Sequence, residues 1–441
     1  MSVQPIEPQL YQSLRVESLG RCTVISPLPY KRFMSDTDLV MYDLDPERLK
    51  ANVEEGIEPL AFERAGARER IYFDPTNVKV AIVTCGGLCP GLNDVIRSMV
   101  HELYFMYGVR RIKGVQYGWA GLNPASRLEL IDLDPRVVQG VNENGGSFLG
   151  SSRGPQPIDV MVDTLLREDI RILFAIGGDG TLRGAVEINK EIKRRKLNIA
   201  VIGVPKTIDN DIGMVSRTFG FDTAVAQAVE SLRCAHVEAR GVRNGIGIVK
   251  LMGRHSGFVA ANAALAVANA SFVLVPEIPF ELDGPDGLLV SLENVLKTRG
   301  HALLVVAEGA GQELFNDELG TDPSGNKKLG DIGVLLKNRI LDYFRSKDME
   351  HTVKYIDPSY IIRSVPAAPN DRIFCVFLGQ HAVHAGMAGK TGTLIGSWNN
   401  LFVHVPIEVA IRRRKQIHPD GILWTSVLES TGQPESMINS R

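Results

Sequence analysis

The sequence predicts an α/β protein with a doubly wound, parallel-sheet architecture and an N-terminal extension, and its length suggests two or three domains. Short apolar runs rich in β-branched residues recur, and each ends in Gly or polar residues: VKVAIVT (78–84), RILFAIGGDG (171–180), NIAVIGVPKT (198–207), GIGIVKLMG (245–253), SFVLVPE (271–277) and HALLVVAEG (301–309). Stretches with helical character, such as LRGAVEINKEIKRRK, follow these runs. Uniformly apolar strands that alternate with helices are typical of parallel sheets covered on both faces.

Composition excludes several classes of protein. The 441 residues are 44% hydrophobic and 23% charged, as in ordinary globular proteins. Lys and Arg (49) nearly balance Asp and Glu (51), so no overall charge points to nucleic acid or to a membrane surface. Five cysteines in so long a chain predict reduced thiols and a cytoplasmic protein, and the N-terminus lacks the pattern of a signal peptide.

Two segments need separate interpretation. Residues 1–77 are rich in Pro, Asp, Glu and Arg, and we expect an extension that packs on the core or on another subunit. Ser256–Pro276 has no charged residue over a length that could span a bilayer. Asn262 and Asn269 interrupt it, however, so we predict a buried helix (AANAALAVANA) followed by a buried strand (SFVLVP).

The glycine-rich loops after the predicted strands are candidates for phosphate binding. In parallel sheets ligands bind beyond the carboxyl ends of the strands. TCGGLCPGLND (84–94) fits either an anion site or a plain tight turn. AIGGDGTLRGA (175–185) is more specific, because its glycines leave the backbone open to phosphates and Asp179 is placed to hold Mg²⁺. The spacing is not that of a dinucleotide fingerprint.

A third loop carries the groups that phosphoryl transfer needs. VPKTIDNDIG (204–213) supplies a cation, Lys206, together with the carboxylates of Asp209 and Asp211. KLMGRHSGF (250–258) and VKYIDPSYIIR (353–363) add cations near a tyrosine, which suit a sugar phosphate, although a surface turn explains the latter equally well. AGMAGKTGT (385–393) imitates a P-loop, but His384 stands where that motif requires Gly, and a helix is expected before it.

Three motifs together, GGDGT, PKTIDND and KLMGRHSGF, resemble phosphofructokinase over roughly residues 78–405. Within this family, the sequence is most similar to the longer enzymes of plants and trypanosomatids. The resemblance implies that Asp209 is the catalytic base and that Asp179 binds Mg²⁺. It implies further catalytic roles for Thr207, Arg254 and Lys206, and nucleotide contacts for Gly87, Tyr117, Arg153, Gly178, Asp179, Gly180 and Thr181. The fructose 6-phosphate site would comprise Thr207, Asp209, Asp211, Met252, Gly253, Arg254, Glu308, Lys354, Tyr360 and Arg363, with Lys354 and Arg363 at the 6-phosphate.

The resemblance also implies an organisation for the whole molecule. Two Rossmann-like domains are expected: a nucleotide-binding domain (78–220 and about 363–405) and a fructose 6-phosphate-binding domain (221–362 and about 406–441). The expected assembly is an allosteric, cytoplasmic homotetramer, with a dimer as the alternative, that binds no nucleic acid and no membrane. Short bacterial enzymes carry an Arg that crosses between subunits where this chain has Gly245, so that contact is either lost or supplied by Arg243.

The phosphoryl donor is the remaining choice. Pyrophosphate enzymes of the family carry Asp at the position of Gly180 and Lys at the position of Lys206, so this chain has one marker of each donor. A carboxylate at position 180 would exclude the α-phosphate of ATP, whereas Lys206 helps either donor. We therefore expect ATP·Mg²⁺, with pyrophosphate as the alternative. A sensor without catalysis would have lost Asp209 or Asp179, and an oxidoreductase would carry the missing dinucleotide fingerprint.

Overall fold

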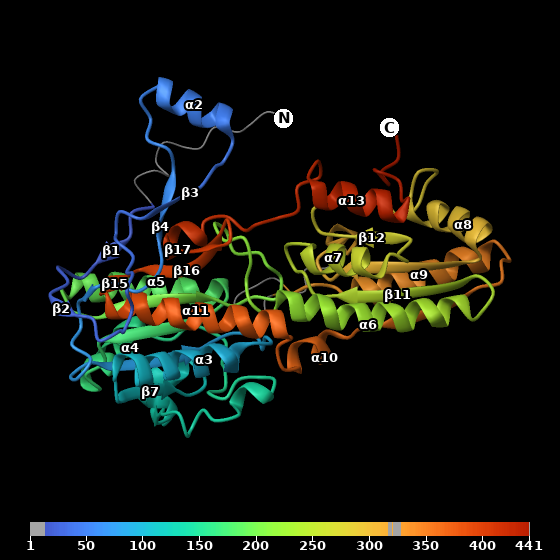
Figure 1. Cartoon of the computed structure of the whole chain (residues 1–441). Coiled ribbons are helices and arrows are strands. Elements are labelled where there is room, and N and C mark those ends of the chain that lie inside the picture. The colour runs from blue at the N-terminus through green and yellow to red at the C-terminus, as the bar shows by residue number, and fades with distance from the viewer. Residues whose placement is uncertain (1–13, 316–319, 321–327, 441) are drawn as a thin grey trace. The chain divides into compact units, whose positions relative to one another are not determined.

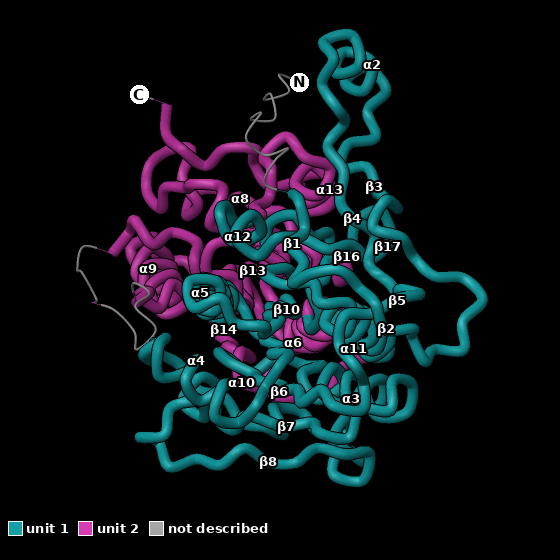
Figure 2. The backbone as a smooth tube through the Cα atoms, turned by 90° about the vertical axis from the view of Figure 1, so that its left-hand side faces the viewer, with its two compact units in different colours: residues 1–207, 212–220, 369–414 teal, residues 208–211, 221–368, 415–441 magenta. Residues whose placement is uncertain are grey.

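The computed structural model describes residues 14–315, 320 and 328–440 (Figure 1). The chain divides into two compact units, coloured separately in Figure 2. Unit 1 consists of residues 1–207, 212–220 and 369–414, and unit 2 of residues 208–211, 221–368 and 415–441. Each unit is built around one large, predominantly parallel sheet with helices on both faces, which confirms the predicted fold class.

The sheet of unit 1 has nine strands. In spatial order these are β3 (Leu39–Met41), β4 (Ala61–Arg64), β17 (Leu401–Pro406), β16 (Thr393–Trp398), β10 (Ala200–Pro205), β9 (Ile172–Gly177), β6 (Lys79–Thr84), β7 (Arg111–Val115) and β8 (Ile131–Asp132). The central run from β16 to β7 is parallel, and the pairs at either side of it are antiparallel. The carboxyl ends of β6, β9 and β10 therefore lie at one edge.

Helices cover both faces of this sheet, and the central strand β9 is accordingly apolar on both sides. Leu173 and Ala175 face the core cluster formed with α4 (Ile158–Arg167) and α5 (Asp179–Arg194). On the other face Phe174 lies so close to α11 (Pro369–Met387) that a Cβ at Gly386 would be 2.9 Å from its ring. Figure 1 shows α3 (Leu92–His101) beside α11, against which it packs. After α3 the chain continues as a π-helical turn, Glu102–Tyr107.

The described part of the N-terminal extension packs on unit 1, the first of the two arrangements expected. β3 and β4 extend the large sheet through β17, and β1 (Glu17–Ser18) pairs with β15 (Lys390–Thr391). β2 (Val24–Ile25) pairs with β5 (Arg70–Ile71), and α2 (Pro46–Glu54) begins after the side-chain cap of Asp45. Short extended segments thus bind the extension to the core, since its few apolar residues cannot form a core of their own.

Unit 2 contains a four-stranded sheet, all parallel, in the order β12 (Phe272–Leu274), β13 (His301–Ala307), β11 (Gly245–Leu251) and β14 (Thr352–Ile356). α6 (Phe221–Arg240) and α7 (Phe258–Val267) pack on one face. α8 (Leu288–Arg299) and α9 (Ile332–Ser346) supply core residues to the other face. The unit also carries α10 (Ser359–Ser364) and α13 (Ile422–Thr431).

Ser256–Pro276 contains a helix and a buried strand, as predicted. The strand is β12, and the helix is α7, which is buried over Val259–Ala264 except at Asn262 and becomes exposed at Ala266. Within the described residues no helix combines the length and the apolar character that a bilayer crossing requires. The segment before Gly389 is helix α11 and not a strand, so AGMAGKTGT lacks the strand that precedes a P-loop.

Candidate functional site

In unit 1 the loops after β6, β9 and β10 meet around Lys206. The ammonium group of Lys206 donates a 2.5 Å hydrogen bond to the carbonyl of Gly87, and the Lys206 N–H donates to the carbonyl of Gly177 at 3.0 Å. A Cβ at Gly86 would lie 3.3 Å from the same ammonium nitrogen. Lys206 is only 6% exposed. The parallel sheet thus brings a buried cation between the two glycine-rich loops that the sequence singled out.

The GGDGT motif forms the start of helix α5. Gly178 is the N-cap residue, so the free N–H groups of the first turn point out of the helix where an anion would bind. Gly177 has no room for a side chain, because its Cβ would lie 2.1 Å from the Thr181 hydroxyl. Gly180 is different, since a Cβ there would meet nothing within 4 Å. The motif therefore combines an obligatory glycine with an open surface above position 180.

Asp179 lies in the first turn of α5 and is held by two arginines. Its Oδ2 accepts hydrogen bonds from Arg183 Nε at 3.1 Å and from Arg414 Nη2 at 3.2 Å. Both contacts use the same oxygen, so Oδ1 has no bond partner within the described residues. No group of three or more His, Cys, Asp or Glu side chains suited to a metal occurs in the described chain. A single carboxylate oxygen fits Mg²⁺ bound chiefly by phosphates and water.

Tyr117 and Arg153 are joined to the glycine loops through residues 149–153. Tyr117 has a positive φ of 52°, and its N–H donates to the carbonyl of Leu149 at 2.8 Å. The Tyr117 ring would lie 2.8 Å from a Cβ at Gly150, so this glycine permits the close approach. The N–H of Gly86 donates to the carbonyl of Ser152 at 3.1 Å. Tyr117 and the segment that leads to Arg153 are therefore held beside the glycine loop after β6.

In unit 2 the loop that carries Asp209 is anchored through its backbone and through Asn210. The carbonyl of Asp209 accepts from Ser256 Oγ at 3.2 Å, and the carbonyl of Asp211 accepts from the Lys415 N–H at 2.9 Å. Lys415 Nζ also donates to Asn210 Oδ1 at 3.0 Å. Ser256 lies two residues after Arg254, so this bond places the predicted base beside the MGR motif.

The MGR motif adopts a backbone that only glycine permits. Gly253 has a φ of 129°, and a Cβ there would lie 2.5 Å from the carbonyl oxygen of Ser256. Met252 beside it is buried at 3% exposure. The Gly309 N–H donates to the Gly253 carbonyl at 3.1 Å, and this bond joins the ends of β11 and β13. Glu308 is thereby brought to the same edge as Arg254.

Glu308, Arg254 and Arg363 form a charged cluster at this edge. Burial raises the pKa of Glu308, and the positive charges of Arg363 and Arg254 oppose that rise. The Nη2 atom of Arg254 is buried and has no hydrogen-bond partner within the described chain. A buried guanidinium nitrogen without a partner is costly unless a ligand satisfies it. The arrangement therefore suits an anionic, hydroxyl-bearing ligand.

The short helix α10 presents Tyr360 and Arg363. Asp357 fixes its first turn by accepting from the Ser359 N–H at 3.1 Å, and Lys250 Nζ lies 3.0 Å from the Asp357 carboxylate. Tyr360 is 82% exposed, and the Arg363 guanidinium lies 5.6 Å from the centre of its ring. Sequence reasoning missed the supporting roles of Lys250, Asp357 and Lys415. For Lys250 the sequence offered one signal, because this lysine stands near the end of the otherwise apolar run GIGIVKL.

The structure also bears on two further predictions, the role of Lys354 and the arginine that crosses between subunits in short bacterial enzymes. Lys354 lies in the middle of β14, opposite Gly247, and its ammonium group lies 3.9 Å from a carboxylate oxygen of Glu238 on α6. The role of Lys354 at the 6-phosphate stays a prediction. Gly245 has no room for the Arg of short bacterial enzymes, because a Cβ there would lie 2.1 Å from the carbonyl of Ala239. Arg243 is exposed and lies 3.5 Å from Glu350.

Comparison with known proteins gives consistent matches. A sequence model of the family described as Phosphofructokinase matches residues 79–386. The ATP-dependent 6-phosphofructokinase of Borreliella burgdorferi is 47% identical over 440 residues, covering 96% of this chain and 98% of that protein. The enzyme of the same name from Amycolatopsis methanolica is 48% identical over 96% of this chain and 95% of its own, and that of Trypanosoma cruzi is 43% identical over 97% and 89%.

Solved structures match at lower identity. The pyrophosphate-dependent phosphofructokinase of Marinobacter aquaeolei superposes with a TM-score of 0.65 at 19% identity, covering 82% of this chain and 94% of that one. Phosphofructokinase from Saccharomyces cerevisiae gives a TM-score of 0.60 at 22% identity, covering 80% and 47%. At these identities the likeness establishes the fold and leaves the choice of donor open.

Proposed function

This chain belongs to the phosphofructokinase family, and on that premise we propose that unit 1 binds ATP and Mg²⁺ and that unit 2 binds fructose 6-phosphate. The chain acts as an ATP-dependent 6-phosphofructokinase, a glycolytic phosphotransferase. It moves the γ-phosphoryl group of ATP to the 1-hydroxyl of D-fructose 6-phosphate and yields fructose 1,6-bisphosphate and ADP. The observation that carries the proposal is the bond between Ser256 and the Asp209 carbonyl, which joins the PKTIDND and MGR motifs within unit 2.

Unit 1 supplies the groups that bind the triphosphate. The open N-terminus of α5 and the glycine loop after β6 offer backbone N–H groups to phosphate oxygens. Lys206, buried between these loops, would offset the negative charge of the transferring group. Asp179 would hold Mg²⁺ through Oδ1, and the bound ion would neutralise phosphate charge. Tyr117 and Arg153, with the glycines and Thr181, complete the proposed nucleotide contacts.

Unit 2 supplies the acceptor site. Asp209 would accept the proton of the 1-hydroxyl, with Asp211 and Thr207 beside it in the chain, so that the hydroxyl oxygen becomes a better nucleophile. Arg254 would stabilise the charge that develops during transfer, and its buried, unpartnered Nη2 supports this role. Glu308 would accept from sugar hydroxyls, and Arg363 would bind the 6-phosphate beside Tyr360.

Two observations support ATP as the phosphoryl donor, the open space at position 180 and the names of the relatives. The space above Gly180 is open, as an α-phosphate would require. The relatives that match most of the chain at 43–48% identity are named ATP-dependent. The pyrophosphate-dependent neighbour shares 19% identity and therefore bears only on the fold.

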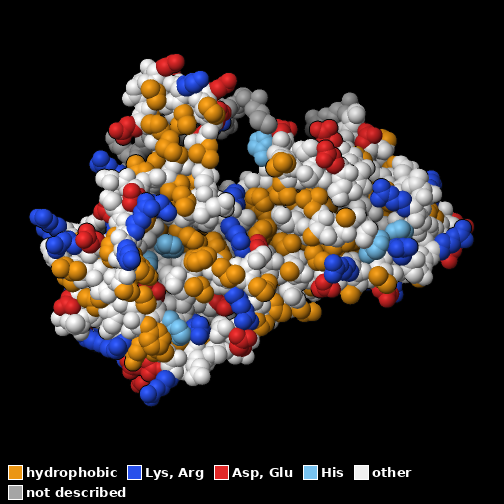
Figure 3. Space-filling view, in the orientation of Figure 1, with side chains coloured by type: hydrophobic (Ala, Val, Ile, Leu, Met, Phe, Trp, Pro, Cys, Tyr) orange, Lys and Arg blue, Asp and Glu red, His pale blue; other side chains and the backbone are white. Residues whose placement is uncertain are grey.

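We further propose that the protein forms an allosteric homotetramer in the cytoplasm, with a dimer as the alternative. Several large apolar side chains remain exposed on unit 1, including Phe105 (62%), Ile373 (56%) and Phe377 (44%). A second copy of the chain would remove them from water. On the face drawn in Figure 3, both signs of charge are interspersed. Sedimentation of the purified protein, with and without substrates, measures the assembly directly.

A coupled assay tests the activity. Purified protein is supplied with fructose 6-phosphate and either ATP or pyrophosphate, each with Mg²⁺, and formation of fructose 1,6-bisphosphate is followed. Turnover is expected with ATP and is expected to stop when EDTA removes the metal. Turnover with pyrophosphate alone would overturn the assignment of donor.

A further inference from the structure

Unit 1 contains a pocket of about 270 Å³ that shares no lining residue with the phosphofructokinase site proposed above. It lies where the N-terminal extension meets helix α11 and the turn between β16 and β17. Tyr30, Arg32 and residues 64–67 come from the extension, His381 from α11, and residues 400–402 from the turn and β17. Most of this lining lies outside residues 79–386, the range that the family model matches. The pocket is therefore built mainly by parts of the chain that lie outside that range.

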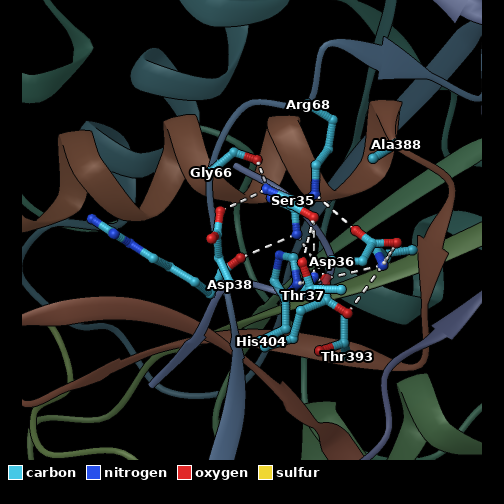
Figure 4. Close-up of polar contacts among 12 residues, drawn as sticks. Ser35, Asp36, Thr37, Asp38, Gly66, Arg68, Ala388, Thr393 and His404 are labelled. Carbon is cyan, nitrogen blue, oxygen red and sulfur yellow. Dashed lines mark hydrogen bonds and ion pairs between the residues drawn. The ribbon is translucent and has the colours of Figure 1, made fainter. Parts of the chain in front are cut away.

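The pocket carries two arginines whose charges are not compensated. Arg32 and Arg64 make no ion pair within the described chain, although both line the cavity. Two of the acids nearby, Asp36 and Glu63, are already engaged by other cations. We call Asp36, Glu63, Arg68 and Lys390 the extension cluster, and Figure 4 shows Asp36 and Arg68 within it.

The charged groups of the extension cluster pair with one another. Arg68 lies 2.9 Å from Asp36 and 2.7 Å from Glu63, and Lys390 lies 2.9 Å from each of the same two carboxylates. Glu63, whose pKa is lowered, also accepts a 3.0 Å hydrogen bond from His404 Nδ1, and burial lowers the pKa of that histidine. Two cations and two anions therefore cancel, and the charge at the pocket is set by Arg32 and Arg64.

The walls of the pocket are flat and aromatic. The ring of His381 stacks on Phe402 with centroids 4.6 Å apart and an interplanar angle of 27°. Tyr30 lies edge-on to His384 at 6.4 Å. Burial lowers the pKa of His381 to about 4, so its ring is neutral near pH 7, and its buried Nδ1 has no hydrogen-bond partner within the described residues. Such a nitrogen is costly unless a ligand or water satisfies it.

One carboxyl group lies close to these histidines. Glu102 Oε1 is 3.9 Å from His384 Nε2, and Tyr107 holds the other ring nitrogen of His384 at 2.9 Å. Burial raises the pKa of Glu102 to about 7. A group that is largely protonated below neutral pH opposes an incoming anion only weakly, so the pocket keeps its positive character.

From these contacts we infer that the pocket is a second ligand site, which binds a small phosphate monoester whose other part is a flat ring. The guanidinium groups of Arg32 and Arg64 hold the phosphate, since planar donors match its oxygens. Tyr30 and the edge of Phe402 pack against the ring, because the faces of Phe402 stack on His381 and Phe374. His381 Nδ1 or the side-chain amide of Asn400 contacts the polar edge of the ring. The volume suits one ring with one phosphate and is too small for a dinucleotide.

The test uses phenyl phosphate as the probe and isothermal titration calorimetry on the full-length protein. ADP, Mg²⁺ and fructose 6-phosphate are present at saturating concentration so that the substrate site is occupied. Saturable binding of one phenyl phosphate per chain is expected. Arg64→Gln and Arg32→Gln should each weaken it about tenfold or more, the loss expected for a charge-assisted contact. Arg136→Gln, which changes an exposed arginine elsewhere in unit 1, is the matched control and should leave binding unchanged.

Three further arms separate the alternatives. Inorganic phosphate should bind more weakly than phenyl phosphate, and phenol should not bind, because each lacks one half of the ligand. Phenyl phosphate that fails to bind at up to about 10 mM would overturn the proposal, as would binding that both arginine variants retain. If a second copy of the chain covers the pocket instead, Arg64→Gln will change the sedimentation of the protein while phenyl phosphate produces no heat. Unchanged KM values for ATP and fructose 6-phosphate verify that the variants are folded.

Discussion

Replacing Gly180 by Asp should abolish most ATP-driven activity without unfolding the protein. A Cβ at this position meets nothing within 4 Å, and the residue lies in the first turn of α5 without a positive φ. Asp is a better helix former than Gly by a few tenths of a kcal/mol, and an acidic group in the first turn adds ~0.3–1 kcal/mol. The fold should therefore tolerate the substitution, and the melting temperature should change by only a few degrees.

The effect on catalysis is expected to be electrostatic. A carboxylate about 4 Å from a phosphate charge costs ~4 kcal/mol at an effective dielectric constant of 20. That energy corresponds to a loss of roughly 10³-fold in kcat/KM for ATP. Gly180→Asn has nearly the same shape without the charge and should lose about tenfold at most. The assay is the coupled reaction over a range of ATP concentrations, with KM for fructose 6-phosphate measured in parallel.

Several outcomes would refute this reasoning. An Asp variant with normal kcat/KM for ATP would mean that the nucleotide does not lie over residue 180. An Asn variant as impaired as the Asp variant would assign the effect to bulk instead of charge. A large fall in the melting temperature of the Asp variant would show that the open space is not available to a side chain.

Three further predictions follow from the site and its surroundings. Asp209→Ser should lower kcat by ~10²-fold or more while KM for fructose 6-phosphate stays nearly constant, and near-normal kcat in steady-state assays would contradict its role as base. Arg363→Ala should raise KM for the sugar roughly 10- to 150-fold, the ~1.5–3 kcal/mol of a charge-assisted bond, and leave KM for ATP unchanged; Arg345→Ala, which changes an exposed arginine on α9 of the same unit, is the control and should change neither. Burial raises the pKa of Glu102 in the folded state to about 7, so the folded state holds this proton more tightly than the unfolded state does. The stability gained in this way is fully present below about pH 4.5 and is lost as pH rises to 7. Glu102→Gln should therefore reduce the fall in melting temperature between pH 4.5 and 7. The part of the free energy of unfolding that depends on Glu102 over this range is at most ~3 kcal/mol, and an unaltered pH profile would argue against this assignment.

The central strands were predictable because their sequence signal is strong. β6, β9, β10, β11, β12 and β13 are buried along their length, so each reads as an apolar run that ends in a glycine or polar turn. β16 and β17 were not predicted. Trp398, Asn399 and Asn400 at their turn resemble an ordinary loop, and the antiparallel pairing that defines these strands depends on distant chain segments.

Position in the sequence predicted some site residues better than others. Motifs that directly follow a strand, such as the MGR sequence, reach the sheet edge because the strand's end fixes them there. Lys354 stands near the start of its motif and lies within β14, where its ammonium group faces Glu238 on α6, so the sequence alone does not show whether it reaches the edge. Asp357 and Lys250 support α10 through contacts between separate elements, and no local pattern announces a contact of that kind.

The pairing of β4 with β17 has a consequence for synthesis on the ribosome. Glu63 and His404, bonded across this pair, are 341 residues apart in the chain. At ~5–20 residues per second, β4 waits roughly 20 to 70 s for its partner after it emerges. Throughout that interval the newly made hairpin of β3 and β4 presents an unpaired edge, and unpaired strand edges recruit other chains. β4 thus stays without this partner strand for most of translation, and the last strand to be made is the one that covers its edge.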